Sequence, residues 1–184
     1  MSALNVFRDL LGPRYDDLPG AVQRFHEPAH DHYRGTAFSG GSDHALARLI
    51  RRVFGFPETG AELDVEIWLS QENGRDRWCR RFAARRFSSS FSAAPDGVLD
   101  ERFPPFRFGF HLQAEGGRMH WVFRRWSLGP VPLPRFLGPR IETWETEAVD
   151  GGFEFYSHAD FPLIGRLIHY HGVVHPVPPA EVRN

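Results

Sequence analysis

The sequence predicts an α+β domain that is mainly antiparallel β-sheet, in which about ten strands form a strongly curved or closed, barrel-like sheet. Apolar residues recur at every second position through most of residues 61–176, the period of one-sided strands. Aromatic residues make up 14% of the chain, and strands favour aromatics. Helical spacing is confined to residues 1–60, and residues 177–184 form a proline-rich tail. We therefore expect one domain with helices in its N-terminal third.

Residues 1–60 contain the predicted helices and the first strand. Apolar side chains at helical spacing over residues 4–11 and 18–25 predict two short helices, separated by Gly12-Pro13. Residues 30–39 resemble a strand that ends at Gly40-Gly41. A third helix is predicted after this strand and before Gly55, and the face that we expect to pack on the core is its apolar one, made of Ala45, Leu46, Leu49, Ile50 and Val53.

Asn73-Gly74 predicts a two-residue hairpin, because both central residues of a type I′ turn need positive φ. In this register Ile67 faces Arg80 and Val65 faces Phe82. The shared face is apolar except for Arg80. The hairpin therefore predicts one arginine inside the sheet.

Gly116-Gly117 predicts a second two-residue hairpin. Its register places Phe110 opposite Phe123 and Phe108 opposite Arg125, so that Arg125 is the second arginine on an apolar face. Gly151-Gly152 predicts a third hairpin, with Ala148 opposite Phe155.

Two further features bear on how the sheet closes. The pattern His-Tyr-x-Gly occurs at residues 32–35 and again at 169–172, in the first and last predicted strands, which suggests that the sheet closes there if these strands are neighbours. Residues 128–139 are too proline-rich for a strand and too apolar for a solvated linker. We expect this segment to pack on the barrel as a flap, with Leu133–Leu137 near a cavity mouth.

Several motifs occur together, in order, between residues 11 and 176. They are Trp78-x-Arg80-x-Phe82, Phe87-x-Ser89, Glu101-Arg102-Phe103, Pro132-Leu133-Pro134-x-x-Leu137-x-Pro139 and Phe161-Pro162-Leu163-x-Gly165-x-Leu167-x-x-Tyr170-x-Gly172. In these motifs the chain resembles the domain-of-unknown-function 4166 family. The resemblance implies no activity and no catalytic residues, because the family has none assigned.

Members of that family occur alone or joined to a dinucleotide-binding domain of the saccharopine-dehydrogenase or epimerase type. The resemblance therefore implies a separate dehydrogenase as a possible partner, for which this chain would be structural. No Gly-x-Gly-x-x-Gly follows a strand in this sequence, so no dinucleotide role is transferred.

Composition excludes several classes of function. A net charge of −1 and a pI of 6.8 disfavour nucleic acid. All 22 basic residues are arginine, which excludes lysine chemistry. Cys79 is the single cysteine, residues 1–11 lack the apolar run of a secretory signal, and no segment is long enough to span a membrane. We expect a reducing, cytoplasmic location.

The histidines invite a metal interpretation. His169, His171 and His175 alternate along the last predicted strand, and His26, His30 and His32 have similar spacing. The alternation favours Tyr170 and Val174 as the core side, which turns the first three histidines to solvent. We therefore expect neither a bound metal nor a cofactor.

The inward arginines are the strongest functional signal. A buried guanidinium needs a carboxylate, carbonyl groups, water or an anionic ligand. Either each arginine reaches the barrel rim or a carboxylate such as Glu101 or Asp160, or it anchors a ligand in an apolar cavity. The candidate ligand-binding residues are Trp78, Arg80, Phe82, Phe110, Trp121, Phe123 and Arg125.

The sequence thus predicts a binding module for an apolar, possibly anionic small molecule. The alternative is a cofactor-independent cyclase or isomerase that uses the same cavity, with a His or Asp as its acid and base. A START-like helix-grip fold is the alternative architecture. It normally ends in a long helix, for which the proline-rich tail leaves no room.

Overall fold

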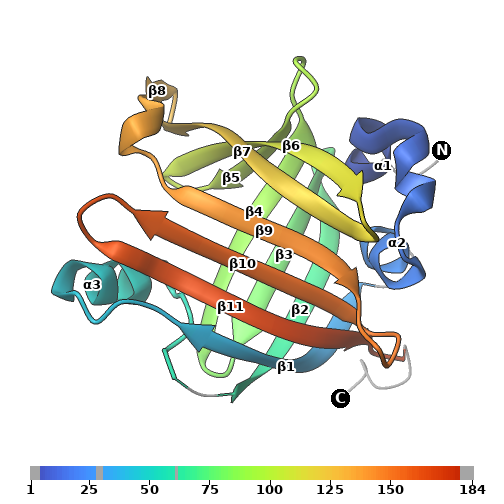
Figure 1. Cartoon of the computed structure of the whole chain (residues 1–184), viewed down its shortest axis with the longest axis horizontal. Coiled ribbons are helices and arrows are strands. Elements are labelled where there is room, and N and C mark those ends of the chain that lie inside the picture. Colours follow the sequence, from blue (N-terminus) through green and yellow to red (C-terminus); the bar gives the residue numbers. More distant parts are fainter. Residues whose placement is uncertain (1–4, 28–30, 61, 179–184) are drawn as a thin grey trace.

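The computed structural model describes residues 5–27, 31–60 and 62–178, so His30 and the tail from residue 179 onward lie outside the described residues. Ten of its eleven antiparallel strands close into a barrel (Figure 1), which confirms the predicted fold class. The strands are β1 (His32–Gly40), β2 (Glu62–Glu72), β3 (Arg75–Phe82), β4 (Arg85–Ala93), β5 (Leu99–Phe103), β6 (Phe106–Glu115), β7 (Arg118–Leu128), β8 (Val131–Leu133), β9 (Arg140–Glu147), β10 (Phe153–Phe161) and β11 (Gly165–Pro176).

Each strand pairs with the next along the chain, with two exceptions. β7 pairs with β9 as well as with the short extra strand β8, and β1 pairs with β11 to close the barrel. At this seam a Cβ on Gly35 would collide with the carbonyl oxygen of Val173, and one on Gly172 would collide with Ala37. The close approach explains why both His-Tyr-x-Gly copies end in glycine. Because β1 and β11 close the barrel, the helix-grip alternative is wrong.

The β2–β3 hairpin has the predicted register. Ile67 faces Arg80 and Val65 faces Phe82, across a turn in which Asn73 and Gly74 both have positive φ. The inward face is buried, Arg80 included. The local turn chemistry was therefore sufficient to place Arg80 inside the barrel.

The β6–β7 hairpin follows its predicted register only near the turn. Phe110 faces Phe123 as expected, but a β-bulge then shifts the pairing by one residue, so that Gly109 faces Arg125. A one-residue shift moves a side chain to the opposite face of the sheet. Arg125 is consequently exposed, and the prediction that it points inward is wrong.

The β9–β10 hairpin differs from its prediction in loop length. The Ala148 N–H donates to the carbonyl oxygen of Gly152 at 2.9 Å, and Asp150 accepts a hydrogen bond from the Gly152 N–H at 3.0 Å, so residues 148–152 all belong to the loop. Phe155 therefore faces Glu145 rather than Ala148. The predicted register is wrong, and Glu145 turns inward as a result.

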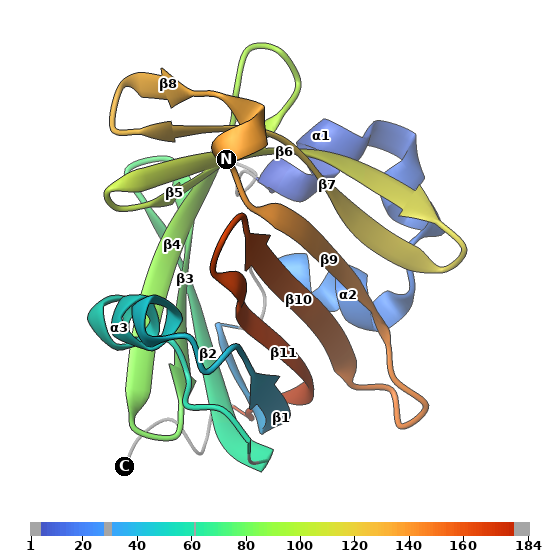
Figure 2. The same cartoon turned by 60° about the vertical axis from the view of Figure 1, so that its left-hand side comes forward.

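The helices cover the two ends of the barrel (Figures 1 and 2). At one end lie α1 (Val6–Leu11), the 3-10 helix η1 (Gly12–Asp17) and α2 (Gly20–His26). They are held there by aromatic packing, since Phe25 stacks on Phe153 at 3.7 Å and Phe7 on Trp78 at 5.5 Å between ring centroids. These contacts seal that end.

At the other end lies α3 (Ala45–Phe54), which packs in the opposite sense to the one predicted. Its buried residues are Ala47 and Arg51, whose guanidinium donates to the carbonyl oxygens of Leu167 at 2.9 Å and Ser42 at 3.0 Å. Leu49 and Val53 are exposed instead. Apart from Ile50, which lines the cavity, the predicted core face is wrong, because the Arg51 hydrogen bonds hold a different side of the helix against the barrel. None of the described helices is long and apolar enough to cross a membrane.

Residues 128–139 pack on the barrel, and part of the segment forms a strand and a 3-10 helix. β8 pairs with β7, and the 3-10 helix η2 (Arg135–Leu137) follows it. The indole Nε1 of Trp126 donates to the carbonyl oxygen of Pro134 at 3.0 Å, which fixes the segment against β7.

Candidate functional site

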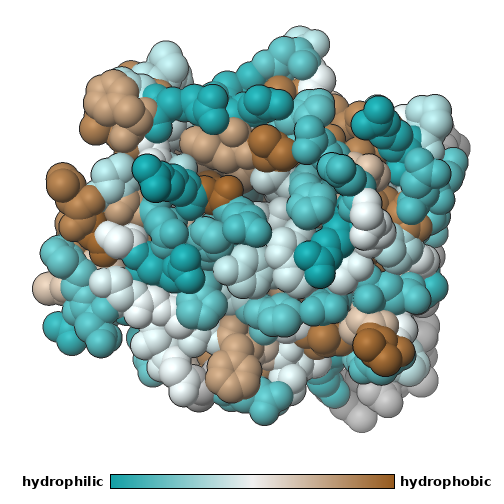
Figure 3. Space-filling model, in the orientation of Figure 1, coloured by the Kyte–Doolittle hydropathy of each residue, from teal (hydrophilic) through white to brown (hydrophobic). Residues whose placement is uncertain are grey.

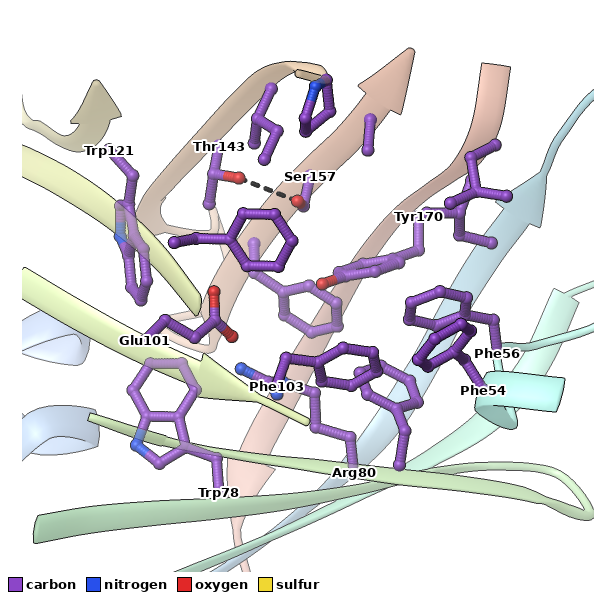
Figure 4. Close-up of a pocket in the computed structure, with 18 of the residues that line it drawn as sticks. Phe54, Phe56, Trp78, Arg80, Glu101, Phe103, Trp121, Thr143, Ser157 and Tyr170 are labelled. Atoms are coloured by element: carbon purple, nitrogen blue, oxygen red, sulfur yellow. Dashed lines mark hydrogen bonds between the residues drawn. The ribbon is translucent and has the colours of Figure 1, made fainter. Parts of the chain in front are cut away.

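The barrel encloses a cavity of about 360 Å³ (Figure 4). This volume is within the usual range for small-molecule sites, about 300–1,000 Å³. Its wall is mostly aromatic and aliphatic, and the charged or hydroxyl-bearing residues in it are Arg80, Glu101, Thr143, Glu145, Tyr156, Ser157 and Tyr170. A few polar groups in an apolar chamber are typical of a site that orients one ligand.

Trp78 and Trp121 form the inner end of the cavity, next to α1 and α2. Their rings lie 5.8 Å apart in an edge-to-face arrangement, and Phe7 of α1 packs against both from behind. The indole Nε1 of Trp121 is buried and has no hydrogen-bond partner among the described residues. It is therefore a donor that an acceptor on a bound molecule would satisfy.

Arg80 carries the permanent positive charge of the cavity. Its side chain comes from β3, the residue is 9% exposed, and Nη1 donates to the hydroxyl of Ser89 at 3.0 Å. The guanidinium carbon lies 4.8 Å from the Trp78 ring centroid and 5.5 Å from that of Phe87, which stabilises the cation by its contact with aromatic faces. The charge is thus held rigidly inside an apolar chamber.

Glu101 of β5 faces Arg80 across Ser89. The Ser89 hydroxyl accepts from Arg80 and donates to the Glu101 carboxylate, so that serine bridges the two charged groups. Burial raises the pKa of Glu101, and this effect exceeds the opposing influence of the Arg80 charge and the Ser89 hydrogen bond. The carboxyl group therefore holds its proton to a higher pH than an ordinary glutamate.

A hydroxyl cluster lies on the other wall of the cavity. Thr143 Oγ1 and Ser157 Oγ are 2.7 Å apart, and Ser157 is also hydrogen-bonded to the phenol of Tyr170. Burial raises the pKa of Tyr170, so its hydroxyl stays protonated. In Figure 4 this phenol points towards Arg80 and Glu101 from β11. The three hydroxyls give a second set of donors and acceptors for a ligand.

Glu145 is the remaining carboxylate of the cavity wall. Its Oε2 lies 2.7 Å from Nε2 of His26 in α2, and both side chains are almost completely buried, at 3% and 0% exposure. This contact ties the helix that closes the inner end to the barrel wall. The role of Glu145 is therefore structural in the first instance.

The structure brings together four of the seven residues predicted to form the site. Trp78, Arg80, Phe110 and Trp121 all line the cavity. Phe82 is fully buried beneath it, against the rings of Phe87 and Tyr170. The remaining two, Phe123 and Arg125, lie elsewhere.

Phe123 lines a second pocket, to which residues of η2 also contribute. Arg125 lies outside the barrel and forms a two-pronged ion pair with Asp96. That carboxylate offsets the arginine charge at the surface, and the predicted position of Arg125 at the cavity is wrong. Leu133–Leu137 do not line the main cavity, although Pro139, just beyond, does.

The sequence interpretation overlooked Tyr170 and Ser157 as cavity residues, and it considered Glu101 only as a partner for a buried arginine. Strand alternation could have found Glu101, because it shares a face with Leu99 and Phe103. Phe54 and Phe56 carried no such signal, since their position depends on how α3 docks. Among the described residues, no group of three or more histidine, cysteine, aspartate or glutamate side chains is placed to hold a metal ion.

Comparisons with known proteins bear on the family and the fold. None of the curated proteins compared with the chain is significantly similar in sequence. Among solved structures, the chain is similar to a protein of unknown function from the DUF3598 family of Nostoc punctiforme, with a TM-score of 0.49 and 10% identity over 81% of this chain. The chain spans only 48% of the length of that protein.

A second similar structure is that of Rv2717c from M. tuberculosis, with a TM-score of 0.46 and 12% identity, over 88% of this chain and 100% of that one. A family model described as a domain of unknown function, DUF4166, matches residues 18–174. The match covers most of the barrel, including every strand that lines the cavity. The chain therefore belongs to the DUF4166 family.

Proposed function

We propose that this chain is a binding module that holds one apolar molecule with an acidic headgroup inside its barrel. The observation that supports this most strongly is Arg80, a buried cation in an otherwise mostly apolar chamber. Of the five N–H groups of its guanidinium, one has a hydrogen-bond acceptor among the described residues, the Ser89 hydroxyl. A carboxylate, sulfonate or phosphate would supply charge-assisted acceptors for the others.

Glu101 adds to this preference for an acidic group. While it keeps its proton, Glu101 does not compensate the arginine charge, and its carboxyl group can donate a hydrogen bond to the ligand. The aromatic wall would enclose the apolar body of the ligand, which provides most of the binding free energy. Trp121 Nε1 and the Tyr170 hydroxyl offer further polar contacts.

The test uses two fluorescent probes that share one ring skeleton. 1-Anilinonaphthalene-8-sulfonate is the acidic probe, and N-phenyl-1-naphthylamine lacks the sulfonate. We expect both to bind at one site per chain, the sulfonate more tightly, because only it can pair with Arg80. Equal affinities for the two probes, or no saturable binding of either, would contradict the proposal. Native mass spectrometry of the purified protein would show whether an acidic molecule accompanies it.

The pH dependence of sulfonate binding should follow the ionisation of Glu101. The sulfonate stays charged throughout, so affinity should fall as the pH rises through the raised pKa of Glu101, when a second anion appears beside it. Glu101→Gln should keep the low-pH affinity and remove this fall. Glu115→Gln, which changes an exposed carboxylate, serves as the matched control. A pH profile unchanged in Glu101→Gln would exclude Glu101 as its cause.

The same group affects the stability of the empty protein. Because the pKa of Glu101 is higher in the folded than in the unfolded state, its protonated form stabilises the fold at low pH, and this contribution is lost as the pH rises through the folded-state pKa. Glu101→Gln should therefore raise the midpoint of thermal unfolding at pH 8 and leave it nearly unchanged at pH 4. Unfolding scans at both pH values measure the effect.

A second candidate function is a cofactor-independent isomerase. Glu101 supports it, since in its ionised form a carboxylate with a raised pKa is a stronger base, which can take a proton from one carbon of a bound ligand and return it to another. The test is deuterium uptake from heavy water into an apolar β,γ-unsaturated acid. Uptake that Glu101→Gln abolishes, with binding retained, would favour the enzyme over the binding module.

A further inference from the structure

The end of the barrel at which α3 lies, opposite α1 and α2, concentrates exposed apolar side chains. Of the ten large hydrophobic residues that are exposed in the described chain, eight lie in α3, the β7–β8 hairpin, η2 and the β10–β11 turn. The other two are Phe38 and Val149. In Figure 3, some of the brown apolar atoms lie along the left side, where Figure 1 places β8 and the β10–β11 turn. Such a concentration on one side of a protein marks an interaction surface.

Six of these exposed residues, from α3, η2 and the β10–β11 turn, form a surface that we call the apolar rim. They are Leu46, Leu49, Val53, Phe136, Leu137 and Leu163. Their exposed fractions are high, for example 69% at Val53, 78% at Phe136 and 100% at Leu163. On α3 the exposure is imposed by Arg51, whose bonds to backbone carbonyls hold the opposite side of the helix against the barrel. The apolar stripe of α3 is thus built to face outward.

Basic residues are interleaved with the rim. Arg48 and Arg52 lie one turn apart on α3, both exposed, and neither forms an ion pair with a described residue. Arg135 precedes Phe136 on η2 and is also exposed. Of the nearby carboxylates, Glu58 and Asp160 are paired with Arg85 and Arg166. Asp43 lies at the start of α3, and Glu142, which lines a depression together with Arg135 and Phe136, lies 3.9 Å from His158. The unpaired charge of this end is predominantly positive.

The rim also adjoins the cavity. Ile50 and Phe54 of the same helix line the cavity, as does Phe161 just before the β10–β11 turn. One face of α3 therefore forms the cavity wall while its neighbouring face is exposed. A surface that bound at the rim would lie directly over the end of the cavity opposite α1 and α2.

We propose that the apolar rim docks on a bilayer that contains anionic phospholipids. Apolar side chains flanked by arginines are the pattern of helices that lie in the membrane interface, where the apolar groups insert among the acyl chains and the cations meet the headgroups. The purpose of docking, the exchange of an apolar ligand between bilayer and cavity, rests on the function proposed above. The docking itself depends only on the rim.

The experiment is co-sedimentation of the protein with vesicles of phosphatidylcholine alone or mixed with phosphatidylglycerol. We expect binding to the mixed vesicles, with Leu49→Asp/Val53→Asp lowering the partition coefficient about tenfold or more. Val149→Asp, an exposed apolar residue outside the rim, is the matched control and should have no effect. Arg48→Gln/Arg52→Gln should reduce the preference for the anionic vesicles, and added salt should do the same.

Other outcomes would overturn the proposal. One is that the protein does not bind vesicles, and another is that the rim and control variants lose vesicle binding equally. A third is that the rim joins copies of the protein, in which case wild type would sediment as an oligomer and Leu49→Asp/Val53→Asp as a monomer. Binding of the two naphthalene probes without vesicles should be the same in wild type and rim variant. If neither protein binds the probes but the wild type still binds vesicles, the proposed function is wrong and the docking proposal stands.

Discussion

Arg80→Met should weaken binding of 1-anilinonaphthalene-8-sulfonate by about 2–5 kcal/mol, roughly 30- to 5,000-fold in the dissociation constant. Among the described residues that line the cavity, Arg80 is the only arginine, so the change removes the charge-assisted hydrogen bonds to the sulfonate. Methionine supplies an apolar chain of similar length. Affinity for N-phenyl-1-naphthylamine, which has no sulfonate, should consequently stay within about threefold of the wild type. Fluorescence titration of both probes measures the two effects.

The variant should also keep its fold. Replacement of a buried charge by an apolar side chain is often neutral or stabilising, and Glu101 can remain protonated once the cation beside it is gone. Arg125→Met is the matched control, because its guanidinium is paired with Asp96 outside the barrel. It should leave both affinities unchanged. If Arg80→Met instead binds both probes equally weakly, the arginine is structural and does not anchor a ligand.

Glu145→Ala should lower the free energy of unfolding by about 3–5 kcal/mol, a fall of roughly 6–20 °C in the midpoint temperature. Removal of this carboxylate leaves the buried Nε2 of His26, now 2.7 Å from Glu145, without its partner. The Nδ1 atom of the same ring already has no partner among the described residues. The contact also holds α2 against the barrel, so its loss should loosen the sealed end of the cavity. Thermal unfolding monitored by circular dichroism gives the measurement.

The chain offers a close control for this effect. His171 and Glu154 make the same contact at the same 2.7 Å on the outside of the barrel, where the histidine side chain is 48% exposed. Glu154→Ala should therefore cost less than about 1 kcal/mol, because water replaces the lost partner. Glu145→Gln, which retains an acceptor for His26, should fall between the two. Equal losses in Glu145→Ala and Glu154→Ala would show that burial does not determine the strength of this pair.

Features decided by a few neighbouring residues could be predicted from the sequence. Asn73-Gly74 dictates its own turn, and the alternating residues on either side then place Arg80, Trp78 and Ile67 on one face. The number of strands and the antiparallel order follow from a two-residue period interrupted by turns. The family resemblance likewise rests on local motifs. These features need no knowledge of the rest of the chain.

The errors arise where distant contacts override a local pattern. The bulge that turns Arg125 outward lies in the pairing of β6 with β7, and the Gly116-Gly117 turn does not predict it. Likewise, Asp150 lengthens a loop in which the sequence suggests only Gly151-Gly152, and this turns Glu145 inward. In both cases a shift by an odd number of residues exchanged the two faces of a strand.

The sequence by itself determined a curved antiparallel sheet with one arginine on its apolar face, because turn chemistry and alternation act over a few residues. The tertiary structure alone decided what that arginine meets. Closure of β1 on β11 creates the enclosed chamber, and β5 brings Glu101 to the far side of Ser89. It also decided the direction of α3, since the carbonyl groups that hold Arg51 come from Leu167, which is far away in the sequence. A helix with an apolar stripe can bury either side, and only the groups it docks against select one.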